Sequence, residues 1–332
     1  MHLIKLNLHP LVRLSILIAM MMVMMGFSFY AAYVCIDSIL DVKLESFEEF
    51  GRWLEDDPDP DKGYSDPDVI WGNGIAVNIS QILGFLGAAF VFVIFFGRTS
   101  VNSFWIRKPH MTILIVPLLG LCASPLIYMS QLLNEWLIPV GGWIEQNIKP
   151  MEDQAAKLTE AFMYMPDSCA LWMNIVAVAV IPAICEEFLF RGVIQSQLGK
   201  AFKNIHVAIW FTAAFFSFIH FQFYGFLPRM LLGAFFGYLL IWTGSIWAPV
   251  VAHFTNNAMA VLGFYYTQHN PDIDVDALES SSVEPLPLIV MSAFFIGGIT
   301  LLMKRSQWSR IKTEYEHSEV IGDQALRNRR MN

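Results

Sequence analysis

A series of long apolar runs, separated by short polar segments, constrains this chain more than any other feature of its sequence. An α-helix rises about 1.5 Å per residue and the hydrocarbon core of a bilayer is about 30 Å thick, so roughly 20 apolar residues span it. The runs that qualify cover residues 14–36, 75–97, 111–133, 168–185, 205–227, 230–242, 247–266 and 286–303. We therefore predict an all-α fold, a polytopic transmembrane helix bundle of about eight spans.

The composition agrees with this prediction and excludes several classes of protein. Hydrophobic residues make up 55% of the 332 residues and charged residues only 15%, and the mean hydropathy is +0.49. Soluble domains carry about a quarter charged residues. A cytosolic enzyme, a disordered chain and a nucleic-acid-binding protein are therefore excluded. We expect an integral membrane protein that contacts membrane lipid and no nucleic acid.

The distribution of basic residues predicts the orientation of the chain. If the N-terminus is cytoplasmic, the cytoplasmic segments carry 14 Lys and Arg residues and the external segments carry 6. Segments that stay in the cytoplasm are enriched in Lys and Arg. We therefore predict a protein of the bacterial plasma membrane with both termini in the cytoplasm.

Two external loops contain apolar residues near helical spacing, which predicts short amphipathic helices on the lipid surface. In the loop after the first span these residues are Leu40, Leu44, Phe47 and Leu54. In the loop after the third span they are Met151, Ala155, Leu158 and Phe162.

Charged residues at the cytoplasmic end of the fourth run are candidates for a functional role, because a charge inside a bilayer costs at least about 3 kcal/mol. Residues four apart share one face of a helix, so Glu187 and Arg191 can form an ion pair that braces the helix. Glu186 is rotated by about 100° from Glu187. It is therefore free to face a cavity and to exchange a proton with water.

Two further apolar runs contain polar side chains that complement Glu186. His220 lies in the run 205–227, and His253 and Asn257, four residues apart, share one face of the run 247–266. A lone histidine in a membrane more often only bonds a neighbouring helix. This set together can support hydrolysis, since a carboxylate activates water, histidines bind a metal or polarise the water, and an amide stabilises an oxyanion.

The same residues form three motifs, in the order Glu186-Glu187-x-x-x-Arg191, Phe216-x-x-x-His220 and His253-x-x-x-Asn257. They resemble the three motifs of the CPBP family, the Abi-type group of CAAX prenyl endopeptidases and bacteriocin-processing proteins. The segment Gly233-x-x-x-Gly237, followed by Thr243-Gly244-Ser245, also resembles that family's approach to its third motif.

The resemblance implies an all-helical intramembrane endopeptidase in which Glu186 is the general base and His220 helps it to activate water. It implies that His253 and Asn257 hold the oxyanion or a metal. Two alternatives stay open for the cofactor: Zn²⁺ or another divalent metal at His220 and His253, or a site without a metal. The implied substrate is a peptide or a membrane protein, including a lipidated one.

The resemblance also divides the chain into three parts: residues 1–167 as an N-terminal transmembrane region with an acidic external loop, 168–266 as the catalytic core, and 267–332 as the last span and a cytoplasmic tail. Two other functions stay open. A proton-coupled transporter could use the same buried residues, although the sequence shows no inverted repeat that would favour it. The other is a non-catalytic membrane scaffold or bacteriocin self-immunity protein.

Overall fold

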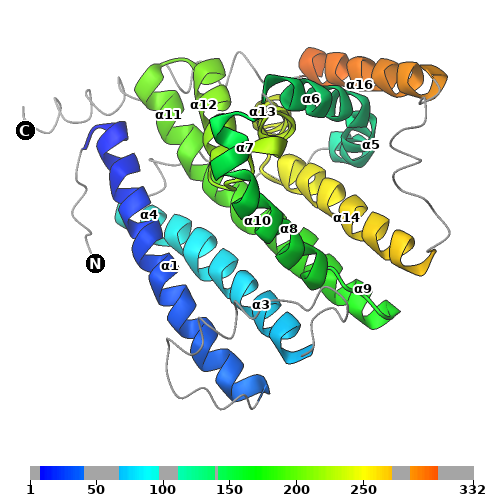
Figure 1. The fold of residues 1–332 in the computed structure, drawn as a ribbon. Coiled ribbons are helices and arrows are strands. Elements are labelled where there is room, and N and C mark those ends of the chain that lie inside the picture. Colours follow the sequence, from blue (N-terminus) through cyan, green and yellow to red (C-terminus); the bar gives the residue numbers. More distant parts are fainter. Residues whose placement is uncertain (1–7, 41–66, 97–110, 139–140, 271–284, 306–332) are drawn as a thin grey trace, which may run out of the picture.

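The computed structural model describes residues 8–40, 67–96, 111–138, 141–270 and 285–305, and all regular elements in these ranges are helices. Figure 1 shows them as a bundle. The predicted all-α fold is confirmed.

The N-terminal part consists of an antiparallel helix pair followed by a third, interrupted helix. The pair is α1 (Pro10–Leu40) and the continuous helix formed by α3 (Pro67–Ile79), the π-helical segment η1 (Ser80–Gly87) and α4 (Ala88–Phe96). The third helix comprises η4 (Met111–Ile115), α5 (Val116–Cys122) and α6 (Ser124–Leu137), and α7 (Trp143–Asn147) and α8 (Lys149–Phe162) follow it. Helix α1 packs closely on η1, since a Cβ on Gly84 would lie 2.5 Å from the Met25 sulfur.

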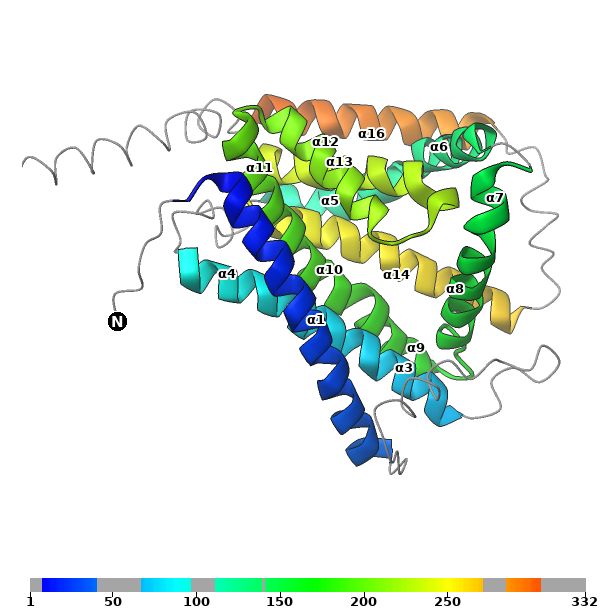
Figure 2. The ribbon, with the colours of Figure 1, turned by 60° about the vertical axis from the view of Figure 1, so that its left-hand side comes forward.

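One long helix forms the centre of the bundle (Figure 2). Its consecutive segments are α9 (Ser168–Asn174), η5 (Ile175–Val180), α10 (Ile181–Glu187), η6 (Phe188–Ile194) and α11 (Gln195–Phe202), where η5 and η6 are π-helical. It begins at Asp167, whose side chain accepts a hydrogen bond from the Ala170 amide, and ends at Lys203, which has a left-handed backbone.

The prediction that this helix ends at Cys185 was wrong. The apolar helix continues over 35 residues, which is about 50 Å and longer than the hydrocarbon core. It can continue because no proline or glycine-rich turn follows Cys185 and because Glu187 and Arg191 are paired within it. Glu186 therefore lies near the middle of this helix rather than at the cytoplasmic end of a span.

The C-terminal part contains α12 (Ile205–Phe218), the short 3₁₀ turn η7 (Phe223–Gly225), α13 (Phe226–Thr243), α14 (Trp247–His269) and α16 (Pro285–Arg305). The predicted span 205–227 is interrupted after Phe218, where Phe221 adopts a left-handed backbone with a φ of 52°. The predicted runs 230–242 and 247–266 form separate helices, α13 and α14, and Gly244 adopts the left-handed conformation between them.

Within the described residues, six helices are long and apolar enough to cross a membrane, two fewer than the predicted spans. They are Pro10–Ile39, Gly74–Phe96, Ile113–Leu137, Ser168–Phe202, Phe223–Thr243 and Pro287–Lys304. The other two predicted spans form helices, but α12 is short and α14 carries His253, Asn256 and Asn257 in its apolar sequence. The integral membrane character of the chain agrees with these helices.

The core surrounds the long helix. Leu189 and Phe190 of η6 are fully buried, and they pack with Leu17 of α1, Phe92 of α4 and Ile209 of α12. A second cluster joins α5, α13, α14 and α16 around Leu239. The long helix is therefore held between the N-terminal helix pair on one side and α12, α13 and α14 on the other.

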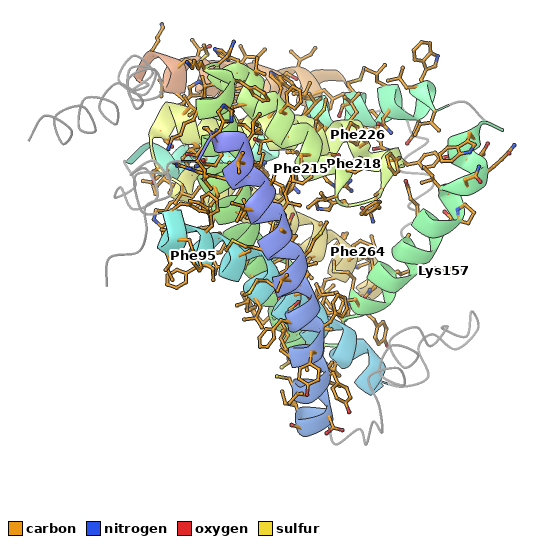
Figure 3. All side chains as sticks on the ribbon, turned by 90° about the vertical axis from the view of Figure 1, so that its left-hand side faces the viewer. Phe95, Lys157, Phe215, Phe218, Phe226 and Phe264 are labelled. Carbon is orange, nitrogen blue, oxygen red and sulfur yellow. The ribbon has the colours of Figure 1, made fainter. Side chains whose placement is uncertain are left out.

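The helix predicted in the second external loop is present as α8. Figure 3 shows Lys157 of α8 at the same end of the bundle as Phe218 and Phe226, with Phe95 of α4 at the opposite end. The helix predicted in the first external loop, around Leu44, Phe47 and Leu54, lies outside the described residues.

Candidate active site

Two adjacent carboxylates and an arginine lie at the centre of the long helix. Glu186 is 5% exposed, Glu187 0% and Arg191 1%. Nη1 of Arg191 donates to Oε1 of Glu187 over 2.8 Å, so the charge of Glu187 is paired inside one turn of the helix. Glu186 is the carboxylate without an arginine partner at hydrogen-bonding distance among the described residues.

Aromatic rings and a backbone carbonyl complete the surroundings of Arg191. Its Nη2 donates to the carbonyl oxygen of Gly233 in α13 over 2.9 Å, and its guanidinium lies 4.7 Å from the Phe216 ring centroid and 5.3 Å from that of Phe236. A Cβ on Gly233 would lie 3.3 Å from this guanidinium and from Ala213. A glycine at this position therefore lets α13 approach both the arginine and α12.

His253 connects the two carboxylates. Its Nδ1 lies 2.9 Å from Oε1 of Glu187, its Nε2 lies 3.9 Å from Oε2 of Glu186, and its ring stacks on Phe236. A carboxylate at Nδ1 favours the tautomer with the proton on Nδ1, which leaves Nε2 as an acceptor directed toward Glu186. Glu187 thus has a second partner that helical spacing could not reveal, because His253 lies 66 residues further along the chain.

Gln81 is a further member of the site that the sequence analysis missed. Its Nε2 donates to Oε1 of Glu186 over 2.9 Å, and it comes from η1, far from the three motifs. The available signal was an amide side chain inside the apolar run 75–97. A polar residue within a span is a functional candidate by default, as it was for the charged residues.

His220 and Asn257 lie further from Glu186 in the hydrogen-bond network. Nδ1 of His220 lies 2.7 Å from the carbonyl oxygen of Phe216, whose ring contacts both His220 and His253. Nδ2 of Asn257 donates to the carbonyl oxygen of Val178 in η5 over 3.0 Å. The structure therefore brings Glu186, Glu187, Arg191 and His253 together directly and links His220 to them through an aromatic ring.

Side chains from two other helices hold the turn that carries His220. Nδ2 of Asn134 in α6 donates to the carbonyl oxygens of Phe223 and Tyr224, and its Oδ1 accepts from the Leu227 amide. Glu152 of α8 accepts hydrogen bonds from the amides of Phe223 and Tyr224. The position of His220 therefore depends on α6 and α8, which lie outside the motif-bearing segment.

The described residues do not fit a metal centre. They contain no group of three or more His, Cys, Asp or Glu side chains arranged to hold a metal ion. A catalytic zinc typically needs three protein ligands. Nε2 of His253 is free to bind a metal, because Glu187 engages only Nδ1, but among the described residues no third ligand of these types converges with His220 and His253.

Three π-helical segments surround Glu186. Gln81 lies in η1, Arg191 lies in η6, and the carbonyl that binds Asn257 belongs to η5. Such wide turns are rare in helices and frequently occur at functional sites. Their position here coincides with the buried polar residues.

The segment that carries the motifs is similar to a known family. Residues 168–259 match a family model described as Type II CAAX prenyl endopeptidase Rce1-like, which confirms the resemblance over this segment. An uncharacterized protein, YpbD of Bacillus subtilis (strain 168), is 27% identical over 120 residues, which are 34% of this chain. The aligned region spans 59% of the length of that relative. No solved structure matches the chain.

Proposed function

We propose that this protein is an intramembrane endopeptidase of the CAAX-protease type that hydrolyses peptide bonds of membrane-associated peptides or proteins, lipidated ones among them. The observation that carries the proposal is the pair formed by Oε2 of Glu186 and Nε2 of His253, 3.9 Å apart and both buried. The family match over residues 168–259 supports it.

The pair is suited to bind and activate one water molecule. Two acceptor atoms 3.9 Å apart do not bond each other but can each accept one hydrogen of the same water. This orients a lone pair of the water oxygen toward a scissile carbonyl carbon. Gln81 fixes one oxygen of Glu186 and Glu187 fixes the imidazole, so both acceptors are held in place before the substrate arrives.

Hydrolysis then follows with Glu186 as the general base. Glu186 takes a proton from the water while the water oxygen bonds to the carbonyl carbon, and the carbonyl oxygen becomes an oxyanion. An Asn side chain has two amide hydrogens, and Val178 occupies one, so Asn257 keeps one to donate to the oxyanion. Collapse of this intermediate breaks the C–N bond, and Glu186 passes the proton to the leaving nitrogen. We assign His220 a supporting role at this site, through the Phe216 ring that contacts both His220 and His253.

Substitution of the base tests the proposal. We expect Glu186→Gln to abolish cleavage while the protein still folds, because an amide cannot accept the proton of the water. The measurement compares peptides in membrane and secreted fractions of cells that express either protein at matched levels. Glu160→Gln, an exposed change on α8, is the control for loss of a carboxylate.

The same experiment separates the alternatives. If no cleavage depends on Glu186, and both proteins rescue a deletion phenotype equally, the scaffold or immunity function replaces the protease.

A second assay tests whether a metal takes part in cleavage. Because the proposed steps use only side chains, cleavage by the purified protein should persist in the presence of a strong zinc chelator, and its loss would show that a metal takes part.

A further inference from the structure

A cavity of about 350 Å³ lies between α1 and the helix formed by α3 and η1. Its lining is predominantly apolar and includes Met25 and Phe29 of α1, Ala76 and Val77 of α3, and Gln81 of η1. Phe29 is 43% exposed and Val77 48%, so the cavity opens on the outer surface of the bundle. Ligand pockets have volumes of about 300 to 1,000 Å³, so this one is large enough for part of a ligand.

Gln81 joins this cavity to the candidate active site. Its amide nitrogen holds Glu186, while its carbonyl oxygen is buried and has no hydrogen-bond partner among the described residues. A buried acceptor without a donor costs about 1 to 3 kcal/mol. The oxygen has almost no accessible surface, so an occupant of the cavity must displace the side chains that cover it before its N–H can bond there and remove that cost.

We propose that this cavity is a substrate subsite that takes an apolar side chain of the peptide, and that the Gln81 carbonyl accepts a backbone N–H of the same peptide. The inference rests on the proposed function and assigns it a specificity pocket. A lipid acyl chain would match the apolar lining but has no N–H to donate. The free acceptor beside Glu186 therefore favours a peptide over a lipid as occupant.

The proposal also makes Gln81 a positioning residue. One side chain contacts both the base and the substrate backbone, so binding in the cavity and alignment of the Glu186 carboxylate are coupled. Since η1 lies outside the segment matched by the family, the N-terminal helices would set which peptides are cleaved.

Photocrosslinking tests the occupant without turnover. The inactive Glu186→Gln protein, reconstituted in vesicles, is exposed either to a peptide that contains photo-leucine or to a phosphatidylcholine with a diazirine in its acyl chain. We expect the peptide to label Met25, Phe29 or Val77 and excess unlabelled peptide to suppress this label. Label from the lipid alone, unaffected by excess peptide, would overturn the proposal in favour of lipid, and no label at these residues from either probe would also overturn it.

Activity provides the second readout. Val77→Phe should fill the cavity and lower kcat/KM about tenfold or more for peptides with Leu or Phe at one position, while it spares peptides with Ala there. Val12→Phe, at a residue of similar exposure on α1, is the control, since Val12 is 46% exposed and is not among the residues that line the cavity. An unchanged preference for side-chain size would contradict the subsite.

Gln81→Leu should lower kcat because it removes the contacts of Gln81 with Glu186 and with the peptide N–H, whereas Gln131→Leu on α6 should leave kcat unchanged.

The two proposals fail differently in these assays. If cleavage depends on Glu186 but neither Val77→Phe nor Gln81→Leu changes it, the subsite is wrong and the protease stands. If no cleavage depends on Glu186, the proposed function itself is wrong.

Discussion

The buried ion pair between Glu187 and Arg191 is the residue-level feature with the largest expected effect on stability. Removal of one partner of a buried pair leaves an uncompensated charge and costs about 3 to 5 kcal/mol. We therefore expect Arg191→Ala to lower the thermal stability of the protein in detergent by a corresponding amount. Arg191 also stacks on Phe216 and Phe236, which adds a packing loss in the same direction.

An exposed pair with the same spacing provides the control. Lys149 and Asp153 on α8 are also four residues apart, and their side chains are 48% and 55% exposed. Exposed pairs of this kind contribute about 0.5 kcal/mol or less. Lys149→Ala should therefore leave the melting temperature nearly unchanged, and equal effects of the two substitutions would show that Arg191 is not paired in a buried environment.

At the residue scale, the sequence analysis predicted a contact between neighbours in one helix and missed contacts between residues far apart in the chain. Glu187 and Arg191 face each other because of helix geometry, which the sequence specifies directly. The bonds from Gln81 to Glu186 and from His253 to Glu187 join residues 105 and 66 positions apart. They depend on how helices pack, and no spacing rule contains that information.

At the scale of elements, α13 packs against its neighbours through two glycines. A Cβ on Gly237 would lie 2.7 Å from Oε1 of Gln195 and 2.9 Å from a methyl group of Ile209, so it would force α13 away from α11 and α12. Overpacking of this kind costs about 1 to 3 kcal/mol. Gly237→Ala should therefore reduce thermal stability in detergent.

Gly263→Ala on α14 is the matched control, because a Cβ there meets no atom within 4 Å. Alanine also favours a helix over glycine by about 1 kcal/mol, so this change should be neutral or stabilising. If Gly237→Ala behaves like Gly263→Ala, the close approach of α13 to α11 and α12 does not exist in the folded protein.

The turn after α12 depends on α6 through Asn134. We expect Asn134→Ala to lower kcat about tenfold with a smaller change in KM, because three hydrogen bonds to the turn are lost and His220 moves relative to Glu186. The measurement is steady-state cleavage of a peptide whose cleavage in cells depends on Glu186. Asn147→Ala removes an exposed hydrogen bond on α7 and should leave kcat unchanged. Equal effects of the two changes on kcat would show that Asn134 does not position His220.

Element boundaries show why only part of the fold could be predicted. The apolar runs located the described helices that are long and apolar enough to cross a membrane, because a segment inside lipid must be apolar. The end of the fourth run was misplaced because a charged pair was treated as a boundary, although the pair is satisfied within the helix. The break after Phe218 was missed because Ser217 and Asn134 hold the turn through tertiary contacts.

At the scale of the whole molecule, the predicted orientation is directly testable. The bias of Lys and Arg predicts that both termini lie in the cytoplasm. A green fluorescent protein fused after the last residue should fluoresce, and alkaline phosphatase at the same position should be inactive. Alkaline phosphatase fused after Leu137, at the end of α6, should be active, and the reverse pattern would invert the orientation.

The π-helical segments let this helix differ in length without a change in the direction of its site residues. A π turn holds one more residue than an α turn that covers the same stretch. Deletion of one residue from η5, such as Ala179, would therefore let the helix close with regular α geometry while the parts on either side keep their relative orientation. The same deletion in α-helical α10 would instead rotate the residues that follow it by about 100°. Among related chains, a gap of a single residue in η5 is therefore compatible with the same site geometry, whereas a gap in α10 is not.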